Sequence, residues 1–179
     1  LLATNLDKAG AIADQYRYWQ GKGYLQSSNV AAAAETFARL ARDFTNSVLL
    51  LEASYSEAEA RFRLGELPQV VGLLQRGDGN FQKAAKVRAN DALVARGFLL
   101  LADALLALKE FKSAEQVVTG LTETNLSPEF KWRRQYALCR VQLTDQRASE
   151  ALVQTTHLLA LATATGQPHL LAASVALQA

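Results

Sequence analysis

The residues that could carry chemistry are few and stand far apart along the chain. Neither His157 nor His169 has a second histidine or a cysteine at ligand spacing, so the sequence predicts no metal site. The single cysteine, Cys139, lies beside Leu138 and Val141, which is typical of a small buried hydrophobe. No pattern pairs a nucleophile with a base, or two carboxylates in a pocket. We therefore predict a chain that is not an enzyme and needs no cofactor.

Two short motifs suggest binding but have simpler explanations. Gly21-Lys22-Gly23 contains the glycines and lysine of a phosphate loop, yet it lacks a preceding strand and the Gly-Lys-Ser/Thr ending. Close packing of two helices explains Gly21 better. The tripeptide Arg76-Gly77-Asp78 is known from cell adhesion, but three residues match by chance in many proteins. We interpret it as part of a turn inserted over residues 75–80.

The most basic segment is Lys131-Trp132-Arg133-Arg134, where an aromatic ring among cations could contact a nucleic acid or an acidic peptide. The whole chain has 19 basic and 17 acidic residues and a net charge of +2, which provides no strong field for a polyanion. We therefore expect Trp132 to face the core and the cations to face solvent. A nucleic-acid contact module stays an alternative, but nucleic acid is not the favoured partner.

The composition predicts an all-helical chain. Half of the 179 residues are hydrophobic, and there are only 3 prolines and 10 glycines. No apolar run reaches the length of a membrane span, and no segment alternates long enough for a strand. Apolar residues instead recur at spacings of three and four, which predicts helices near 6–27, 30–43, 47–64, 67–75, 81–88, 91–108, 111–121, 128–143, 147–163 and 168–179.

Helix starts are marked by prolines and by polar capping residues. Proline suits the first turn of a helix, where its missing N–H group has no partner in any case, and Pro68, Pro128 and Pro168 all fit that position. Side chains that could cap the first N–H groups are Asn29, Ser47, Asn90 and Ser127. The linkers are mostly two to five residues long, which predicts antiparallel helix hairpins.

The hairpins repeat. Three units can be aligned on a small residue in the first helix. The positions compared lie three residues after it in the same helix, and twelve and sixteen residues after it in the second helix. These are Gly21, Tyr24, Ala33 and Phe37; Ala58, Arg61, Val70 and Leu74; and Ala102, Leu105, Ala114 and Val118. The small residue lets the second helix approach closely, and the large residue at +16 fills the groove beside it. Each hairpin leaves one face uncovered, so the units must stack.

This spacing resembles the tetratricopeptide repeat, and the first unit, 18–24 with Ala33 and Phe37, is the best match. Its ending, Arg42-Asp43-Phe44-Thr45-Asn46-Ser47, is similar to segments of bacterial envelope and outer-membrane assembly members of that family. The resemblance implies an all-α, right-handed superhelix, an α-solenoid of antiparallel hairpins. We expect residues 1–179 to form one such solenoid fragment, with units near 14–46, 47–80, 89–124 and 127–164 and a half unit at 167–179.

The chain also departs from the family pattern. Thr45 replaces the usual proline, Arg61 replaces an aromatic residue, and the units are 37 and then 44 residues apart. The fourth hairpin, 128–163, fits more than one register, so no site residue is assigned to it. The final half unit leaves an apolar face without its partner helix, which allows self-association. The absence of methionine suggests a piece of a longer or processed protein.

The resemblance implies a scaffold or adaptor that binds a protein or peptide along the concave face of its first helices. If the register is right, this face carries Gln15, Tyr18, Lys22, Gln26, Glu52, Tyr55, Glu59, Arg63, Arg96, Leu99 and Asp103. Tyr18 and Tyr55 recur at equal offsets and are the expected groove anchors. Both charge signs occur on the face, so it lacks a cationic clamp for an acidic C-terminal tail.

Two settings for the scaffold stay open. The resemblance of the 42–47 segment favours a bacterial periplasmic or outer-membrane-associated assembly. The alternative is a regulatory or sensor arm of a larger cytoplasmic protein, such as a transcription regulator or an enzyme.

Overall fold

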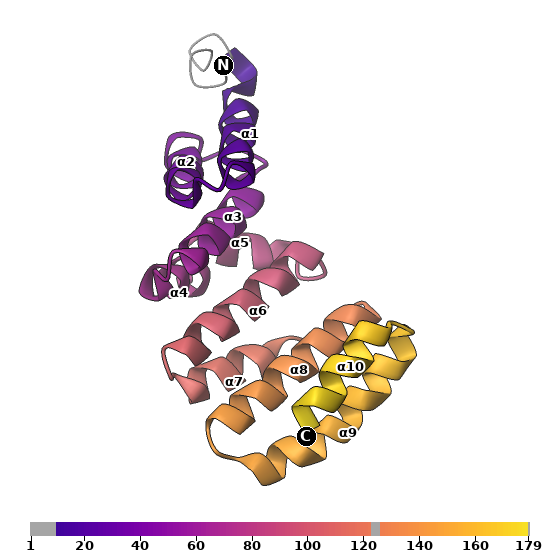
Figure 1. Ribbon diagram of the computed structural model, residues 1–179. Coiled ribbons are helices and arrows are strands. Elements are labelled where there is room, and N and C mark those ends of the chain that lie inside the picture. Colours follow the sequence, from indigo (N-terminus) through magenta and orange to yellow (C-terminus); the bar gives the residue numbers. More distant parts are fainter. Residues whose placement is uncertain (1–9, 123–125, 179) are drawn as a thin grey trace. The chain divides into compact units, whose positions relative to one another are not determined.

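The computed structural model describes residues 10–122 and 126–178, and every regular element in these ranges is a helix (Figure 1). The expected all-α fold is confirmed. Contacts within the chain divide it into two compact units, residues 1–97 and 98–179, which we call the N-terminal and C-terminal halves. The halves are described separately.

The N-terminal half begins with a short 3₁₀ helix, η2, and continues with α-helices that pack in sequence. Within it, α2 contacts α1 and α3, and α3 contacts both α4 and α5. Helix α6 starts in this half and continues into the next. The elements are η2 (Gly10–Ile12), α1 (Ala13–Gln26), α2 (Val30–Asp43), α3 (Leu50–Arg63), α4 (Leu67–Gln75), α5 (Asn80–Val87) and α6 (Ala92–Ala107).

The C-terminal half contains the rest of α6 and four further helices. Helix α8 packs against α7 and α9, and α10 packs against α9. Their bounds are α7 (Phe111–Gly120), α8 (Pro128–Thr144), α9 (Ala148–Thr165) and α10 (Pro168–Gln178). Most predicted bounds agree to within two residues. The exceptions are the first helix, whose predicted start at residue 6 lies outside the described residues, and the third, which begins at Leu50 rather than 47.

Some of the predicted helix starts are confirmed in detail. The side chain of Asn29 accepts a hydrogen bond from the Ala32 N–H at 3.3 Å, and Ser127 accepts one from Phe130 at 3.4 Å. These bonds satisfy backbone donors that the first turn of a helix leaves unpaired. The three prolines occupy the first turns of α4, α8 and α10, as expected.

Two predicted caps are wrong. Ser47 is not the N-cap residue of α3, because α3 begins only at Leu50. Its hydroxyl accepts a hydrogen bond from the Leu49 N–H at 3.1 Å and donates to the Asp14 carboxylate in α1. Asn90 does not cap α6. The cap is the neighbouring residue Asp91, whose carboxylate accepts a hydrogen bond from the Leu93 N–H at 2.8 Å. In the first case the helix begins three residues after the serine. In the second case the carboxylate is the acceptor.

The small and large residues of the first unit pack as their spacing predicts. A β-carbon added at Gly21 would lie 2.6 Å from Cε1 of Phe37, so only glycine lets α1 and α2 come this close. Phe37 and Ala33 are completely buried. In the third unit, Ala102 and Val118 share a buried cluster, so the same offset operates there.

The wider spacing between the second and third units comes from an extra helix. Helix α4 ends at Gln75, and α5 follows after the 76–79 turn that the sequence marks as an insertion. Phe81 of α5 is completely buried and lies directly against Gly97 of α6, where a β-carbon would clash with its ring. The 44-residue spacing therefore adds an element to the core rather than a loose loop.

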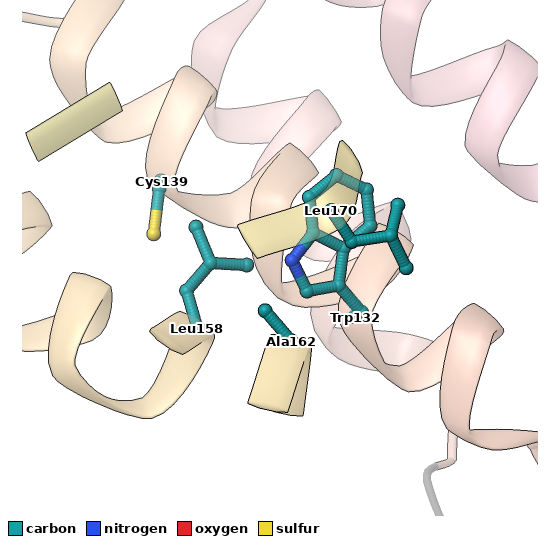
Figure 2. Close-up of a cluster of buried hydrophobic side chains, with 5 residues drawn as sticks. All are labelled: Trp132, Cys139, Leu158, Ala162 and Leu170. Carbon is teal, nitrogen blue, oxygen red and sulfur yellow. The ribbon is translucent and has the colours of Figure 1, made fainter. Parts of the chain in front are cut away.

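The core of the C-terminal half is built around Trp132 and Leu158 (Figure 2). Cys139, Ala162 and Leu170 complete the cluster, and all five residues are buried. Cys139 is confirmed as a small core residue. Burial raises the pKa of its thiol to about 11, so the reactive thiolate is disfavoured at neutral pH.

Candidate functional site

A pocket of about 400 Å³ lies in the C-terminal half across α6, α8 and α10. In the hairpin scheme these are the first helices of three consecutive units, the helices that the sequence predicts for the binding face. We call this pocket the α6–α8–α10 groove. Its walls are formed by Leu99, Asp103, Trp132, Arg133, Tyr136, Ala137, Arg140, His169, Leu170 and Ala173.

The apolar part of the groove is anchored to the core by an aromatic pair. The rings of Trp132 and Tyr136, one turn apart on α8, stack with centroids 4.9 Å apart and planes inclined by 21°. The Trp132 indole N–H donates to the Ser174 hydroxyl at 2.9 Å, and that hydroxyl donates to the Leu170 carbonyl at 2.8 Å. These bonds tie α8 to α10, so this wall is held in one geometry.

An ion pair crosses the groove from α6 to α8. Arg140 donates to the Asp103 carboxylate at 2.7 Å, and both side chains keep more than a third of their surface exposed. Burial raises the pKa of Asp103, and the nearby Arg140 guanidinium opposes this effect. One guanidinium donor is used in this bond, so other donors of Arg140 can serve a bound group.

The second cation of the groove, Arg133, lies one helical turn before Tyr136 on α8. Arg133 pairs with Glu129 at 2.7 Å and lies 5.8 Å from the centre of the Phe130 ring. About half of its side chain is exposed. His169 on α10 is also exposed and lines the groove. The groove thus combines an apolar wall with a rim of both charge signs.

Two of the predicted binding residues, Leu99 and Asp103, lie in this groove. Arg133, Tyr136 and Arg140 also line the groove and are not among the predicted binding residues. Their spacing of three and four residues on α8 is a usable signal, but the ambiguous register of the fourth hairpin prevented its assignment. The predicted residue Arg96 is exposed on α6 within the N-terminal half.

The predicted binding residues of α1 differ widely in exposure. Gln15 and Gln26 are exposed, and Lys22 is half-buried. Tyr18 is half-buried, with its ring centre 5.8 Å from that of Phe37. Burial raises the pKa of Tyr18, a hydrogen bond with Ser56 lowers it, and the charge of Glu52 raises it further. Tyr18 therefore contributes to the core as well as to the surface.

On α3, the predicted binding residues take part in ion pairs or packing. Glu52 pairs with Arg88 at 3.4 Å, and Glu59 pairs with Arg63 at 2.6 Å. Tyr55 is half-buried and interacts with another residue of the chain. The role of Tyr18 and Tyr55 as groove anchors stays a prediction.

Two aromatic groups of the chain are placed differently. In the group of Tyr16, Tyr18, Trp19 and Tyr24, Trp19 is 62% exposed, so not all four rings face the core. In the basic segment, Trp132 is buried as expected, with 6% of its surface exposed, whereas Arg133 is exposed. A buried indole presents no free face on which a nucleic-acid base could stack.

The part of the chain that the structure describes holds no group of three or more metal-ligating side chains. None of its helices is long and apolar enough to cross a membrane.

The fold is similar to that of solved repeat proteins. No family model and no curated protein matches the sequence. A structure of nearly identical TPR-like repeats, from a protein of Podospora anserina designated a kinesin light chain, has a TM-score of 0.69 and 18% identity. That match covers 91% of this chain and 85% of the other. A structure of a substituted variant of the same repeats has a TM-score of 0.70 and 17% identity, covering 97% and 87%. The chain therefore has the TPR-like helical repeat fold that its residue spacing predicts.

Proposed function

We propose that this chain is a non-enzymatic protein-interaction scaffold and that the α6–α8–α10 groove binds a segment of a partner protein. One observation carries the proposal: a groove runs over the first helices of three consecutive units, the last of which is the half unit formed by α10. Stacked hairpins use this face because it offers side chains from several repeats to one ligand. The TPR-like fold supports a binding role, since such repeats commonly form assembly scaffolds.

The groove has the composition of a peptide-binding surface. Leu99, Ala137 and Ala173 line the groove together with the ion pair of Asp103 and Arg140. An apolar floor provides most of the binding energy, and polar groups around it fix the position of the ligand. A partner segment with one or two large apolar side chains and polar flanks fits this arrangement.

A peptide selection tests the groove directly. Phage-displayed peptides of about 12 residues are selected on the chain, a length that spans several helices when extended. Binding of the best peptides is then measured by fluorescence anisotropy. Ala137→Arg places a long charged side chain in the groove and is expected to weaken binding by about tenfold or more. The matched control is Ala160→Arg, an exposed position on α9 outside the groove.

Equal binding to both variants would show that the selected peptides use another surface, which would contradict the proposal. Circular dichroism of each variant establishes that the helices are retained. Within the same proposal, the segment 42–47 favours a bacterial envelope assembly. Its alternative is a regulatory arm of a larger cytoplasmic protein, and the sequence flanking this chain distinguishes the two settings.

A further inference from the structure

The last two helices of the C-terminal half differ from the rest of the chain in charge. Residues 151–179 contain no Asp, Glu, Lys or Arg, although these residue types make up 20% of the sequence. Both helices nevertheless expose large apolar side chains: Leu152 of α9 is 56% exposed, and Leu171 and Val175 of α10 are 41% and 53% exposed. Exposed apolar side chains without charged neighbours are typical of the centre of a protein–protein interface.

The exposed apolar residues of α10 form a stripe along the helix. Leu171 and Val175 are one turn apart, Ala172 and Ala176 lie beside them, and all four are exposed. The buried residue Ser174 marks the side of α10 that bonds α8, so the stripe points away from α8. The stripe is also separate from the α6–α8–α10 groove, because its four residues are not among those that line the groove.

A row of exposed residues on α9 continues the stripe. Leu152, Thr156 and Thr163 lie on one side of α9, at spacings that bring residues of a helix to the same face. Gln154, which accepts a hydrogen bond from Gln135 of α8 at 2.8 Å, lies on the opposite side. Both rows therefore face away from α8, and they form one surface because α9 and α10 pack side by side (Figure 1). We call this surface the α9–α10 face.

Helix α10 is covered on fewer sides than α8. Within the described residues, α8 packs between α7 and α9, whereas α10 packs mainly against α9 and bonds α8 through Ser174. The sequence of α10 is apolar around most of the helix and contains no charged residue. A helix that is apolar on all sides is normally covered on all sides. The α9–α10 face is therefore a surface that another helix would be expected to cover.

The face is complementary to itself. When two copies of α10 are placed antiparallel about a two-fold axis between positions 173 and 174, Leu171 of one copy lies opposite Ala176 of the second copy. In the same arrangement Val175 lies opposite Ala172. Each large side chain then meets a small one, which lets the two helices interdigitate. Like charges do not meet, because neither row carries a charge.

We propose that the α9–α10 face binds a second copy of this chain and that the protein forms a two-fold symmetric dimer. A partner with a charged surface is disfavoured, because its charges would lose their hydration without gaining a counter-charge. A membrane surface is disfavoured as well, because helices that lie on membranes carry lysine or arginine along their polar side. An identical uncharged face meets neither obstacle.

The size of the face predicts a weak dimer. Helices α9 and α10 are 18 and 11 residues long, so the face is about 20 Å wide and about 16–27 Å long. Such a face is smaller than the roughly 800 Å² that each partner buries in a standard interface. We therefore expect a dissociation constant in the micromolar range.

The inference goes beyond the proposed function and does not rest on it. The stripe and the α6–α8–α10 groove lie on different sides of α10, so the groove stays open in the dimer. The dimer would present two grooves, and a partner that carries two copies of the bound segment would bind more tightly than one that carries a single copy.

Sedimentation velocity of the chain at concentrations of about 1–300 µM tests the proposal, because this range brackets a micromolar dissociation constant. The sedimentation coefficient is expected to rise with concentration and to fit an equilibrium between monomer and dimer. A chain that stays monomeric over the whole range would overturn the proposal. Growth into larger assemblies would overturn it as well, because a two-fold contact closes at the dimer.

Two variants place a charge at the centre of the face. Val175→Lys and Ala172→Glu are each expected to weaken association by about tenfold or more, because the new charge would be buried without a partner. Both positions are exposed, so the melting temperature is expected to stay unchanged. In an equal mixture of the two variants the introduced charges face each other across the axis, so the dimer is expected to return. A mixture that stays monomeric would overturn the two-fold arrangement.

Two further variants control for added charge and for other exposed apolar residues. Val48→Lys adds the same charge at a valine that is 83% exposed between α2 and α3, and Trp19→Lys changes an indole that is 62% exposed on α1. Both variants are expected to form the dimer as the wild-type chain does. A dimer that survives Val175→Lys, or that is lost equally with either control, would overturn the proposal.

Discussion

Arg140 of α8 donates a 2.7 Å hydrogen bond to the carboxylate of Asp103 on α6. The two residues are 37 positions apart in the chain, yet they meet because consecutive hairpins place their first helices side by side. The bond lies on the wall of a groove that Arg133 and His169 also line. It fixes the position of two opposite charges on one wall of the groove.

The glycines of α1 provide a test of the helix packing. Gly21→Ala is expected to lower the free energy of unfolding by about 1–3 kcal/mol, because the new methyl group would lie 2.6 Å from the Phe37 ring. Gly23→Ala is the matched control, because nothing lies within 4 Å of its added β-carbon. There the substitution is expected to raise the free energy of unfolding by about 0.5–1 kcal/mol through helix propensity.

Urea unfolding of both variants, monitored by circular dichroism, measures these changes. A stabilising effect of Gly21→Ala would mean that α1 and α2 are not closely packed at this position.

The hydrogen bond between Trp132 and Ser174 provides a test of the groove's aromatic wall. Ser174→Ala leaves the indole N–H buried without a partner, so the free energy of unfolding is expected to fall by about 1–3 kcal/mol. Thr156→Ala, on the exposed side of α9, is expected to change it by less than about 0.5 kcal/mol. Thermal unfolding compares the two variants. Equal melting temperatures would show that the indole has no structural bond to α10.

The ion pair of Glu115 and Arg147 predicts a pH dependence of stability. Arg147 binds the Glu115 carboxylate through both outer nitrogens at 2.7 Å, and these bonds lower the pKa of Glu115. Because the pKa of Glu115 is lower in the folded state than in the unfolded state, the pair stabilises the fold at pH values above the unfolded-state pKa. This stabilisation is lost as the pH falls through the lower, folded value.

Glu115→Gln is therefore expected to lower the free energy of unfolding by about 1 kcal/mol at pH 7. The difference from the wild type should vanish at a pH below the folded pKa of Glu115. Urea unfolding at pH 7, 4 and 2.5 follows the difference. A difference that stays constant with pH would rule out a contribution from the charge of Glu115.

The parts of the fold that were predictable depend on local spacing. Helix bounds follow from apolar residues at intervals of three and four, and the contact of Gly21 with Phe37 follows from a fixed offset within one hairpin. Both signals lie within about 20 residues of sequence, where the geometry of a hairpin is nearly constant. The assignment of Cys139 and Trp132 to the core follows from the same periodicity.

The parts that were missed depend on contacts between hairpins. Ser47 donates its hydroxyl proton to Asp14, 33 residues earlier, and this contact could not be read from the local capping pattern. The groove residues Arg133, Tyr136 and Arg140 were not assigned because the fourth hairpin fits several registers in the sequence, and only packing against α6 and α10 fixes one. Arg61 was recognised as a departure from the repeat, but its three carboxylate partners lie on different elements.

The most direct test of the central claim is an NMR titration of the isotopically labelled chain with a peptide selected as described above. The proposed scaffold function predicts that the backbone amide signals of Leu99, Ala137 and Ala173 shift together and saturate at one peptide per chain. The amide signal of Ala160, on the exposed side of α9, should stay unchanged. Shifts centred on residues outside the α6–α8–α10 groove, with those three signals unchanged, would contradict the account.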